Sequence, residues 1–83
     1  MIQTVLKRDG RVVGFNEEKI ATAIRKAMLH TDKGEDLQLI HQITDRISFK
    51  GDSQMTVEAI QDLVEVELMK SSRKDVAQKY IAY

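Results

Sequence analysis

Apolar residues recur at helical spacing in four segments of this chain, and short polar stretches separate the segments. Side chains three and four positions apart lie on one face of a helix, so each segment can bury a single apolar stripe. The apolar positions are Ile20, Ala23, Ile24, Ala27 and Met28, then Leu37, Ile40, Ile43 and Ile47, then Ile60, Leu63, Val64 and Leu68, and finally Val76, Ala77, Tyr80 and Ile81. The pattern predicts four amphipathic helices around one core.

The boundaries of these helices are marked by residues that cap or interrupt a helix. Asn16 and Thr56 each precede a segment, and their side-chain oxygens can accept hydrogen bonds from the free N–H groups of a first turn. The Ser-Arg-Lys-Asp sequence at residues 72–75 has the serine-to-acid spacing of a capping box, which predicts the start of the last helix. Polar loops are expected over residues 31–34 and 51–54.

The N-terminal segment has the pattern of a β-hairpin. Two apolar runs, residues 2–6 and 12–15, flank Asp9 and Gly10, which tolerate the positive φ values of a tight two-residue turn. Because the loops are short and proline is absent, consecutive helices are expected to lie antiparallel, with the hairpin covering one end. We therefore predict a mainly α, α+β fold: a four-helix bundle capped by a small N-terminal hairpin or sheet, in one domain over residues 1–83.

Positive side chains gather around the predicted turn. Lys7, Arg8 and Arg11 would project together from it, and Lys19, in the first turn of the following helix, could reach back toward them. Cations held apart from carboxylates are stabilised by a polyanion, so this cluster indicates a site for a phosphorylated ligand. A solvated hairpin tip explains the same residues. Because 13 basic and 13 acidic residues balance, only local clustering favours the ligand site.

Composition excludes several kinds of chemistry within these residues. Cysteine is absent, which excludes disulfides, thiolate metal sites and cysteine-based radical or nucleophilic catalysis here. No apolar stretch approaches the roughly 20 residues that span a membrane, and the apolar core of a signal peptide is missing, so we expect a soluble, cytoplasmic protein. His30 and His41 have no partners at metal-ligand spacing and are expected on the surface. We expect no catalytic and no metal-binding residue.

Two further groups of residues are expected to have structural roles. Methionines in the core would fill irregular gaps, because their side chains are flexible. These are Met28, Met55 and Met69. The acidic residues of the third helical segment should form a solvated face rather than a catalytic pair. These are Glu58, Asp62, Glu65 and Glu67.

Four motifs occur in a fixed order along the chain. They are Val5-x-Lys7-Arg8-Asp9-Gly10, Phe15-Asn16-x-x-Lys19-Ile20, Thr56-x-x-x-Ile60-Gln61-Asp62-x-Val64-Glu65 and Val76-Ala77-x-x-Tyr80-Ile81-x-Tyr83. Together they resemble the ATP-cone, a regulatory nucleotide-binding domain at the N-terminus of many ribonucleotide reductases. The resemblance covers nearly the whole chain. It implies a four-helix bundle capped by a small β-sheet, excised from a longer protein that contains the catalytic machinery.

The resemblance implies a binding site for ATP or dATP as an allosteric effector, accompanied by Mg²⁺. The residues that it implies are Val5 and Ile20 beside the base, Lys7, Arg8 and Lys19 on the phosphates with Asn16 next to them, and Thr56 and Gln61 in contact with the adenine or closing the site. Some cones carry an acidic residue near the position of Val13. Because this chain has valine there, both one bound nucleotide and two bound nucleotides stay as alternatives.

Among reductases, the motifs most resemble those of anaerobic ribonucleoside-triphosphate reductases, whose overall activity in deoxyribonucleotide synthesis the domain would control. Its partners would be adenine nucleotides, the parent catalytic domain and a second copy of itself. The alternatives within the family are a cone of another reductase class or of a nucleotide-sensing transcriptional repressor, although no zinc ribbon precedes Val5. The alternatives outside it are a nucleic-acid-binding module, disfavoured by the balanced charge, and a protein-interaction bundle.

Overall fold

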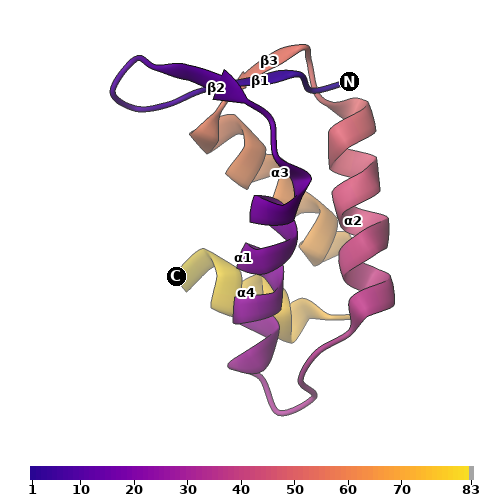
Figure 1. Ribbon diagram of the computed structural model, residues 1–83. Helices are drawn as coiled ribbons and strands as arrows, with labels where there is room; N and C mark the ends of the chain where they lie inside the picture. Colours follow the sequence, from indigo (N-terminus) through magenta and orange to yellow (C-terminus); the bar gives the residue numbers. More distant parts are fainter. Residues whose placement is uncertain (83) are drawn as a thin grey trace.

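The computed structural model describes residues 1–82, which form three short strands and four helices (Figure 1). In chain order these are β1 (Thr4–Leu6), β2 (Val12–Gly14), α1 (Glu17–Leu29), α2 (Leu37–Lys50), β3 (Gln54–Thr56), α3 (Val57–Lys70) and α4 (Lys74–Ala82). The predicted α+β architecture is confirmed. Tyr83, the last residue of the fourth motif, lies outside the described residues.

The helices form a closed ring in which each packs on two others: α1 on α2 and α4, and α3 on α2 and α4. Figure 1 shows α1 descending and α2 returning beside it, so this pair is antiparallel as expected. The largest fully buried side chains lie at the centre of the ring and belong to the predicted stripes. They are Ile24, Met28, Ile43, Ile47, Leu68, Val64 and Val76. The Cα radius of gyration is 12.4 Å.

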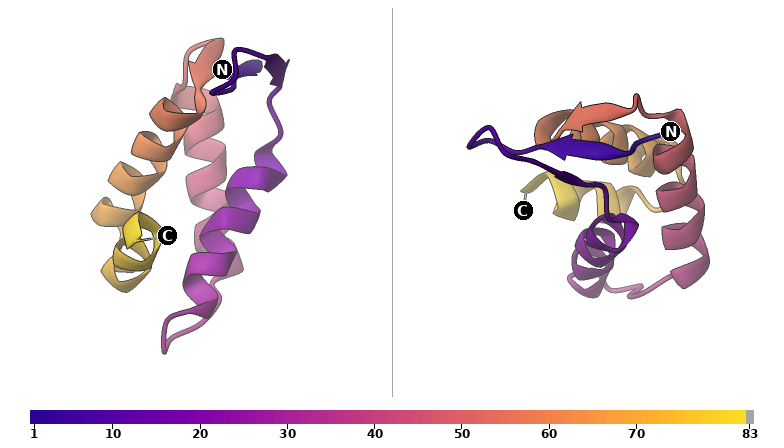
Figure 2. Two further views of the ribbon diagram at one scale, coloured as in Figure 1. Left: turned by 90° about the vertical axis from the view of Figure 1, so that its left-hand side faces the viewer. Right: turned by 45° about the horizontal axis from the view of Figure 1, so that its top comes forward.

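The sheet lies across one end of the helices, as the two views of Figure 2 show. Its order is β2-β1-β3, with β1 in the centre. Val5 of β1 is opposite Val13 in an antiparallel pair and opposite Met55 in a parallel pair. The third strand corrects the sequence prediction, which placed Gln54 in a loop. A strand of three residues shows no periodicity, and only pairing with β1 fixes its conformation.

The hairpin turn also differs from the prediction. The Lys7 N–H donates to the Arg11 carbonyl at 2.8 Å, and the Gly10 N–H donates to the Lys7 carbonyl at 2.9 Å. The loop therefore has three residues, Arg8, Asp9 and Gly10. Only Gly10 adopts a positive φ, at 90°, while Asp9 does not, as expected for a turn followed by a glycine bulge. Asp9 instead accepts a hydrogen bond from the Arg11 N–H at 3.0 Å.

All three predicted helix starts are confirmed, and two of them have the predicted cap. Asn16 accepts from the Glu18 N–H at 3.0 Å, and Thr56 accepts from the Ala59 N–H at 3.1 Å. The capping box at residues 72–75 is wrong. The Arg73 N–H donates to the hydroxyl of Ser71, and Asp75 accepts from the Arg73 guanidinium and from the N–H groups of Val76 and of Asp75 itself.

Arg73 fastens the end of the bundle that lies away from the sheet. Its guanidinium donates to the Thr31 hydroxyl at 3.1 Å and to the Gly34 carbonyl at 2.9 Å, both in the α1–α2 loop. It also pairs with Asp75 at 3.1 Å, and only 10% of its side chain is exposed. This arginine joins the α1–α2 loop to the start of α4.

Some helical residues differ from the prediction in how exposed their side chains are. Leu37 and Ile81 are more than half exposed, because they occupy the first residue of α2 and the last turn of α4. Met69 is 49% exposed and is not a core filler. Conversely, Glu67 is only 4% exposed and binds Arg46 and Lys50 of α2, so it is not part of a solvated face.

The histidines lie on the surface as expected. Within residues 1–82, none of the helices is long and apolar enough to cross a membrane.

Candidate functional site

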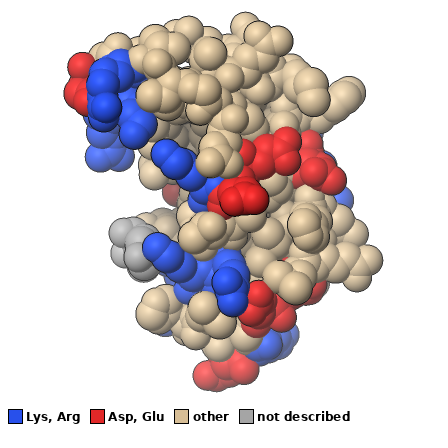
Figure 3. Space-filling view, in the orientation of Figure 1, with Lys and Arg blue, Asp and Glu red and all other residues tan. Residues whose placement is uncertain are grey.

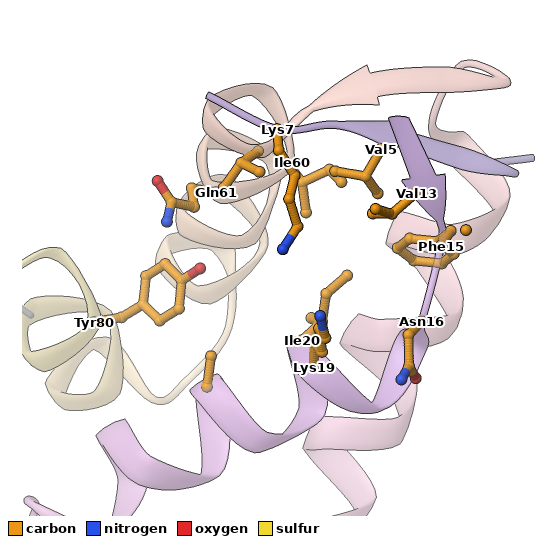
Figure 4. Close-up of a pocket in the computed structure, with 13 residues that line it drawn as sticks. Val5, Lys7, Val13, Phe15, Asn16, Lys19, Ile20, Ile60, Gln61 and Tyr80 are labelled. Atoms are coloured by element: carbon orange, nitrogen blue, oxygen red, sulfur yellow. The ribbon is translucent and has the colours of Figure 1, made fainter. Parts of the chain in front are cut away.

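A pocket of about 330 Å³ lies between the sheet and the helices (Figure 4). The strands and the β2–α1 connection form one side, the first half of α1 forms another, and α3 and α4 complete it. The lining residues are Val5, Lys7, Val13, Gly14, Phe15, Asn16, Lys19, Ile20, Ala23, Val57, Ile60, Gln61 and Tyr80. Elements from the first strand to the last helix therefore meet at this pocket.

Apolar side chains form most of the wall. Val5 and Val13 are cross-strand neighbours in β1 and β2, so their side chains lie on the same face of the sheet. Ile20 faces them from α1 and Ile60 from α3, and Phe15 lies beside Val13 in Figure 4. A wall of this kind excludes water and can hold a flat, weakly polar ring.

Two lysines supply the positive charge of the pocket. Figure 4 shows the amine of Lys7 extending from the sheet into the space between Ile20 and Ile60, while Lys19 stands on the first turn of α1 across from it. Within the described part of the chain, neither lysine forms an ion pair with a carboxylate. Two unpaired ammonium groups beside an apolar wall suit an anionic ligand.

Asn16 contributes to the pocket through its position at the start of α1. Its side chain caps the helix, so the backbone N–H groups of the first turn lie at this edge of the pocket. The N-terminus of a helix carries partial positive charge and adds to the attraction for an anion.

Gln61 and Tyr80 form the far side of the pocket. Tyr80 is half-buried, and Figure 4 shows its hydroxyl turned toward the cavity. Burial, with a smaller contribution from the Glu65 carboxylate, raises the pKa of Tyr80 above its usual value. The hydroxyl is therefore protonated at neutral pH and can donate a hydrogen bond to a ligand.

The arginines of the hairpin do not join the lysines, contrary to the predicted cluster of cations. Arg8 Nε lies 2.5 Å from Glu58 Oε1, and Arg11 Nε lies 2.6 Å from Asp9 Oδ2. Hydrogen bonds from its own backbone N–H and from Arg8 lower the pKa of Glu58. Hydrogen bonds from the Arg11 backbone and guanidinium lower the pKa of Asp9. In Figure 3, basic side chains gather at the hairpin tip, with acidic ones beside them.

The structure brings together six of the residues predicted for the site: Val5, Lys7, Asn16, Lys19, Ile20 and Gln61. The pocket lining does not include Arg8, which turns toward Glu58, or Thr56, whose hydroxyl caps α3. Sequence reasoning missed the remaining lining residues. Several of these residues had a signal, since Phe15, Ile60 and Tyr80 belong to the four motifs and Ala23 follows Ile20 by three positions on α1.

The arrangement combines an apolar wall with an anion-binding edge, which suits a ligand with an aromatic ring and a negatively charged group. Among residues 1–82, no three His, Cys, Asp or Glu residues are placed to share a metal ion.

Comparisons with known proteins agree with this description. Residues 3–83 match the family model described as the ATP cone domain. The chain is 42% identical to a vitamin B12-dependent ribonucleoside-diphosphate reductase of Thermoplasma acidophilum, over 100% of this chain and 12% of that protein. It is 36% identical to a ribonucleoside-diphosphate reductase subunit alpha of Chlamydia pneumoniae, over 96% of this chain and 9% of that protein. It is 30% identical to an anaerobic ribonucleoside-triphosphate reductase of Haemophilus influenzae, over 95% of this chain and 12% of that protein. The chain thus spans about a tenth of the length of these relatives.

Proposed function

Since this chain belongs to the ATP-cone family, we propose that it is an allosteric domain that binds ATP or dATP in the pocket beneath the sheet. The observation that carries the proposal is the meeting of an apolar wall in one cavity with Lys7 and Lys19, which form no ion pair among residues 1–82. The triphosphate would supply the negative charge and the adenine the flat ring.

We propose that the base packs on Val5 and Ile20 and that the phosphates extend toward Lys7 and Lys19. Gln61 would hydrogen-bond to the adenine, since its amide both donates and accepts. Thr56 would help close the site from the first turn of α3. Arg8 would reach the phosphates only after leaving Glu58. Mg²⁺ would accompany the triphosphate, because this ion is commonly held by phosphates and its own waters.

In this proposal the domain itself catalyses nothing and acts on its neighbours. ATP and dATP differ by one hydroxyl, and a hydrogen bond to that group contributes only about 1 kcal/mol net. The regulatory difference would then lie in the assembly that each nucleotide stabilises, formed with the parent catalytic domain or with a second copy. Because coupling free energies are reciprocal, the isolated domain would keep its nucleotide site and lose the regulatory effect.

We propose that residues 1–83 form a single regulatory domain of a ribonucleotide reductase, in the cytoplasm, where its effector is available. As the parent we propose an anaerobic ribonucleoside-triphosphate reductase, supported by the motif resemblance and the Haemophilus relative. A vitamin B12-dependent reductase is the second candidate, supported by the 42% identity to the Thermoplasma protein. Assays of the parent protein with ribonucleoside diphosphates and triphosphates, with and without vitamin B12, would separate the two.

Calorimetric titration with ATP, dATP and GTP in the presence of Mg²⁺ tests the site. We expect saturable binding of the adenine nucleotides in preference to GTP, with a stoichiometry that distinguishes one bound nucleotide from two. Lys7→Ala and Lys19→Ala should each weaken ATP binding about tenfold to a hundredfold, since a charge-assisted hydrogen bond contributes about 1.5–3 kcal/mol.

The matched control is Lys33→Ala, an exposed lysine in the α1–α2 loop at the other end of the domain, which should leave ATP affinity unchanged. Wild-type affinity in both pocket variants would contradict the site. Absence of nucleotide binding would favour a protein-interaction bundle. Binding to DNA that ATP does not displace would favour a nucleic-acid module.

A further inference from the structure

An ion pair bridges two parts of the chain at the edge of the pocket. Arg8 stands in the hairpin loop and Glu58 in the first turn of α3, and their side chains meet at 2.5 Å. Arg8 directly follows Lys7, and Glu58 directly follows Val57. Both Lys7 and Val57 line the pocket. The pair therefore joins the hairpin loop to the start of α3, one residue along the chain from the pocket lining on each side.

The pair is well suited to exchange partners. The Arg8 and Glu58 side chains are 72% and 53% exposed, and ion pairs this exposed contribute little to stability because water and salt screen them. A triphosphate carries several negative charges and offers a guanidinium bidentate contacts that are stronger than a screened carboxylate pair. A long, flexible side chain held at the rim can turn toward such a ligand.

We propose that Glu58 determines the affinity of the pocket for triphosphates by holding Arg8 away from it until the phosphates take the carboxylate's place. The inference rests on the proposed function, since it requires a phosphorylated ligand in this pocket. Glu58 thus acts as an internal competitor for the guanidinium. Removing its charge makes Arg8 available to the ligand in advance.

Two simpler roles for Glu58 give different predictions. The carboxylate also accepts a hydrogen bond from its own backbone N–H at the start of α3, so its loss could act on the helix alone. It could also repel phosphates directly, without involving Arg8. Only the exchange of partners makes the effect of Glu58 depend on Arg8, and a double-mutant cycle measures that dependence.

The experiment is a set of ATP titrations on wild type, Glu58→Gln, Arg8→Ala and the double variant, with thermal unfolding to verify that each folds. We expect Glu58→Gln to tighten ATP binding about twofold to fivefold, the range that corresponds to an exposed ion pair. Arg8→Ala should weaken it, and Glu58→Gln should have no effect in the Arg8→Ala background. AMP affinity should be the same in wild type and Glu58→Gln.

Asp9→Asn provides the control, because Asp9 is a carboxylate with the same 53% exposure, paired with Arg11 on the same hairpin. It should leave ATP affinity unchanged. Tightening by Glu58→Gln that persists without Arg8 would identify direct repulsion and overturn the inference. Unchanged ATP affinity in Glu58→Gln would also overturn the inference about Glu58. The proposed function would still stand in that case, provided that the wild type binds ATP. Failure of wild type to bind ATP would overturn both.

Discussion

The two ends of this domain each use an arginine to join distant segments, and they do so in opposite ways. At the sheet end, Arg8 is 72% exposed and pairs with Glu58. At the other end, Arg73 is 10% exposed and binds Asp75, the Thr31 hydroxyl and the Gly34 carbonyl. A buried guanidinium with several partly buried partners fixes a junction, whereas an exposed one with a single solvated partner can be released. The difference indicates a rigid end and an adaptable end, and the pocket lies at the adaptable one.

Arg73→Ala should have the largest effect on stability. The substitution removes the hydrogen bonds that join the α1–α2 loop to α4 and leaves their partners partly buried, which should cost about 2–4 kcal/mol. Urea unfolding measures the loss as a shift in midpoint at constant slope. A loss below that of Arg8→Ala would break the comparison between the two ends.

Glu67→Gln should follow, because Glu67 is only 4% exposed and ties α3 to Arg46 and Lys50 of α2. Burial tends to raise the pKa of Glu67, but the hydrogen bonds and charges of Lys50 and Arg46 outweigh it, and the net pKa lies below the usual 4.5. The ionised carboxylate of Glu67 therefore stabilises the fold at pH values above 4.5. This stabilisation is lost as the pH falls from there through the lowered pKa of the folded state.

At neutral pH we expect Glu67→Gln to lose about 1.5–3 kcal/mol of unfolding free energy. The variant should also lose less stability than wild type on acidification below about pH 4.5. Denaturant titrations across this range measure both effects. Parallel acid profiles for the two proteins would show that Glu67 does not titrate as described.

Gly51→Ala should destabilise the protein where the α2–β3 loop packs against the sheet. A methyl group there would lie 2.7 Å from Met55 Sδ and closer still to Ile2, in a buried position. Overpacking of this kind costs about 1–3 kcal/mol, with the lower half expected because side chains can shift. Gly14→Ala is the control, since a methyl group at Gly14 meets nothing within 4 Å. Equal thermal stabilities of the two variants would contradict this view of the packing.

Arg8→Ala should have the smallest effect on stability, below about 1 kcal/mol, because its ion pair is exposed and screened. The loss should shrink further in 1 M salt, where the screening length is about 3 Å. Thermal unfolding at low and high salt measures it. A loss comparable with that of Arg73→Ala would mean that the hairpin is fastened as firmly as the opposite end.

The sequence predicted those features that local patterns determine. The helical stripes, the caps at Asn16 and Thr56 and the presence of a hairpin each depend on residues within a few positions of one another. The features that it missed depend on contacts between distant segments. β3 forms only by pairing with β1, and the structural role of Arg73 depends on partners about 40 residues away.

The candidate site follows the same division. Motif resemblance indicated the residues of β1 and α1 that line the pocket. It did not predict that Arg8 would turn to Glu58, since an ion pair across 50 positions leaves no local trace in the sequence. Tyr80 belongs to the fourth motif, but the resemblance gave it no part in the site, because its place in the pocket depends on how α4 packs against α1 and α3.

The pocket draws its walls from both the first and the last elements of the described chain, β1 and α4. A nucleotide that touches Lys7 and Tyr80 at once would act as a reversible cross-link, closing a loop of most of the domain's length. Covalent links of that span stabilise proteins largely by restricting the unfolded chain. A bound nucleotide would instead hold the folded ends together for only as long as it stays, so occupancy would set how far α4 can move from β1 across the pocket.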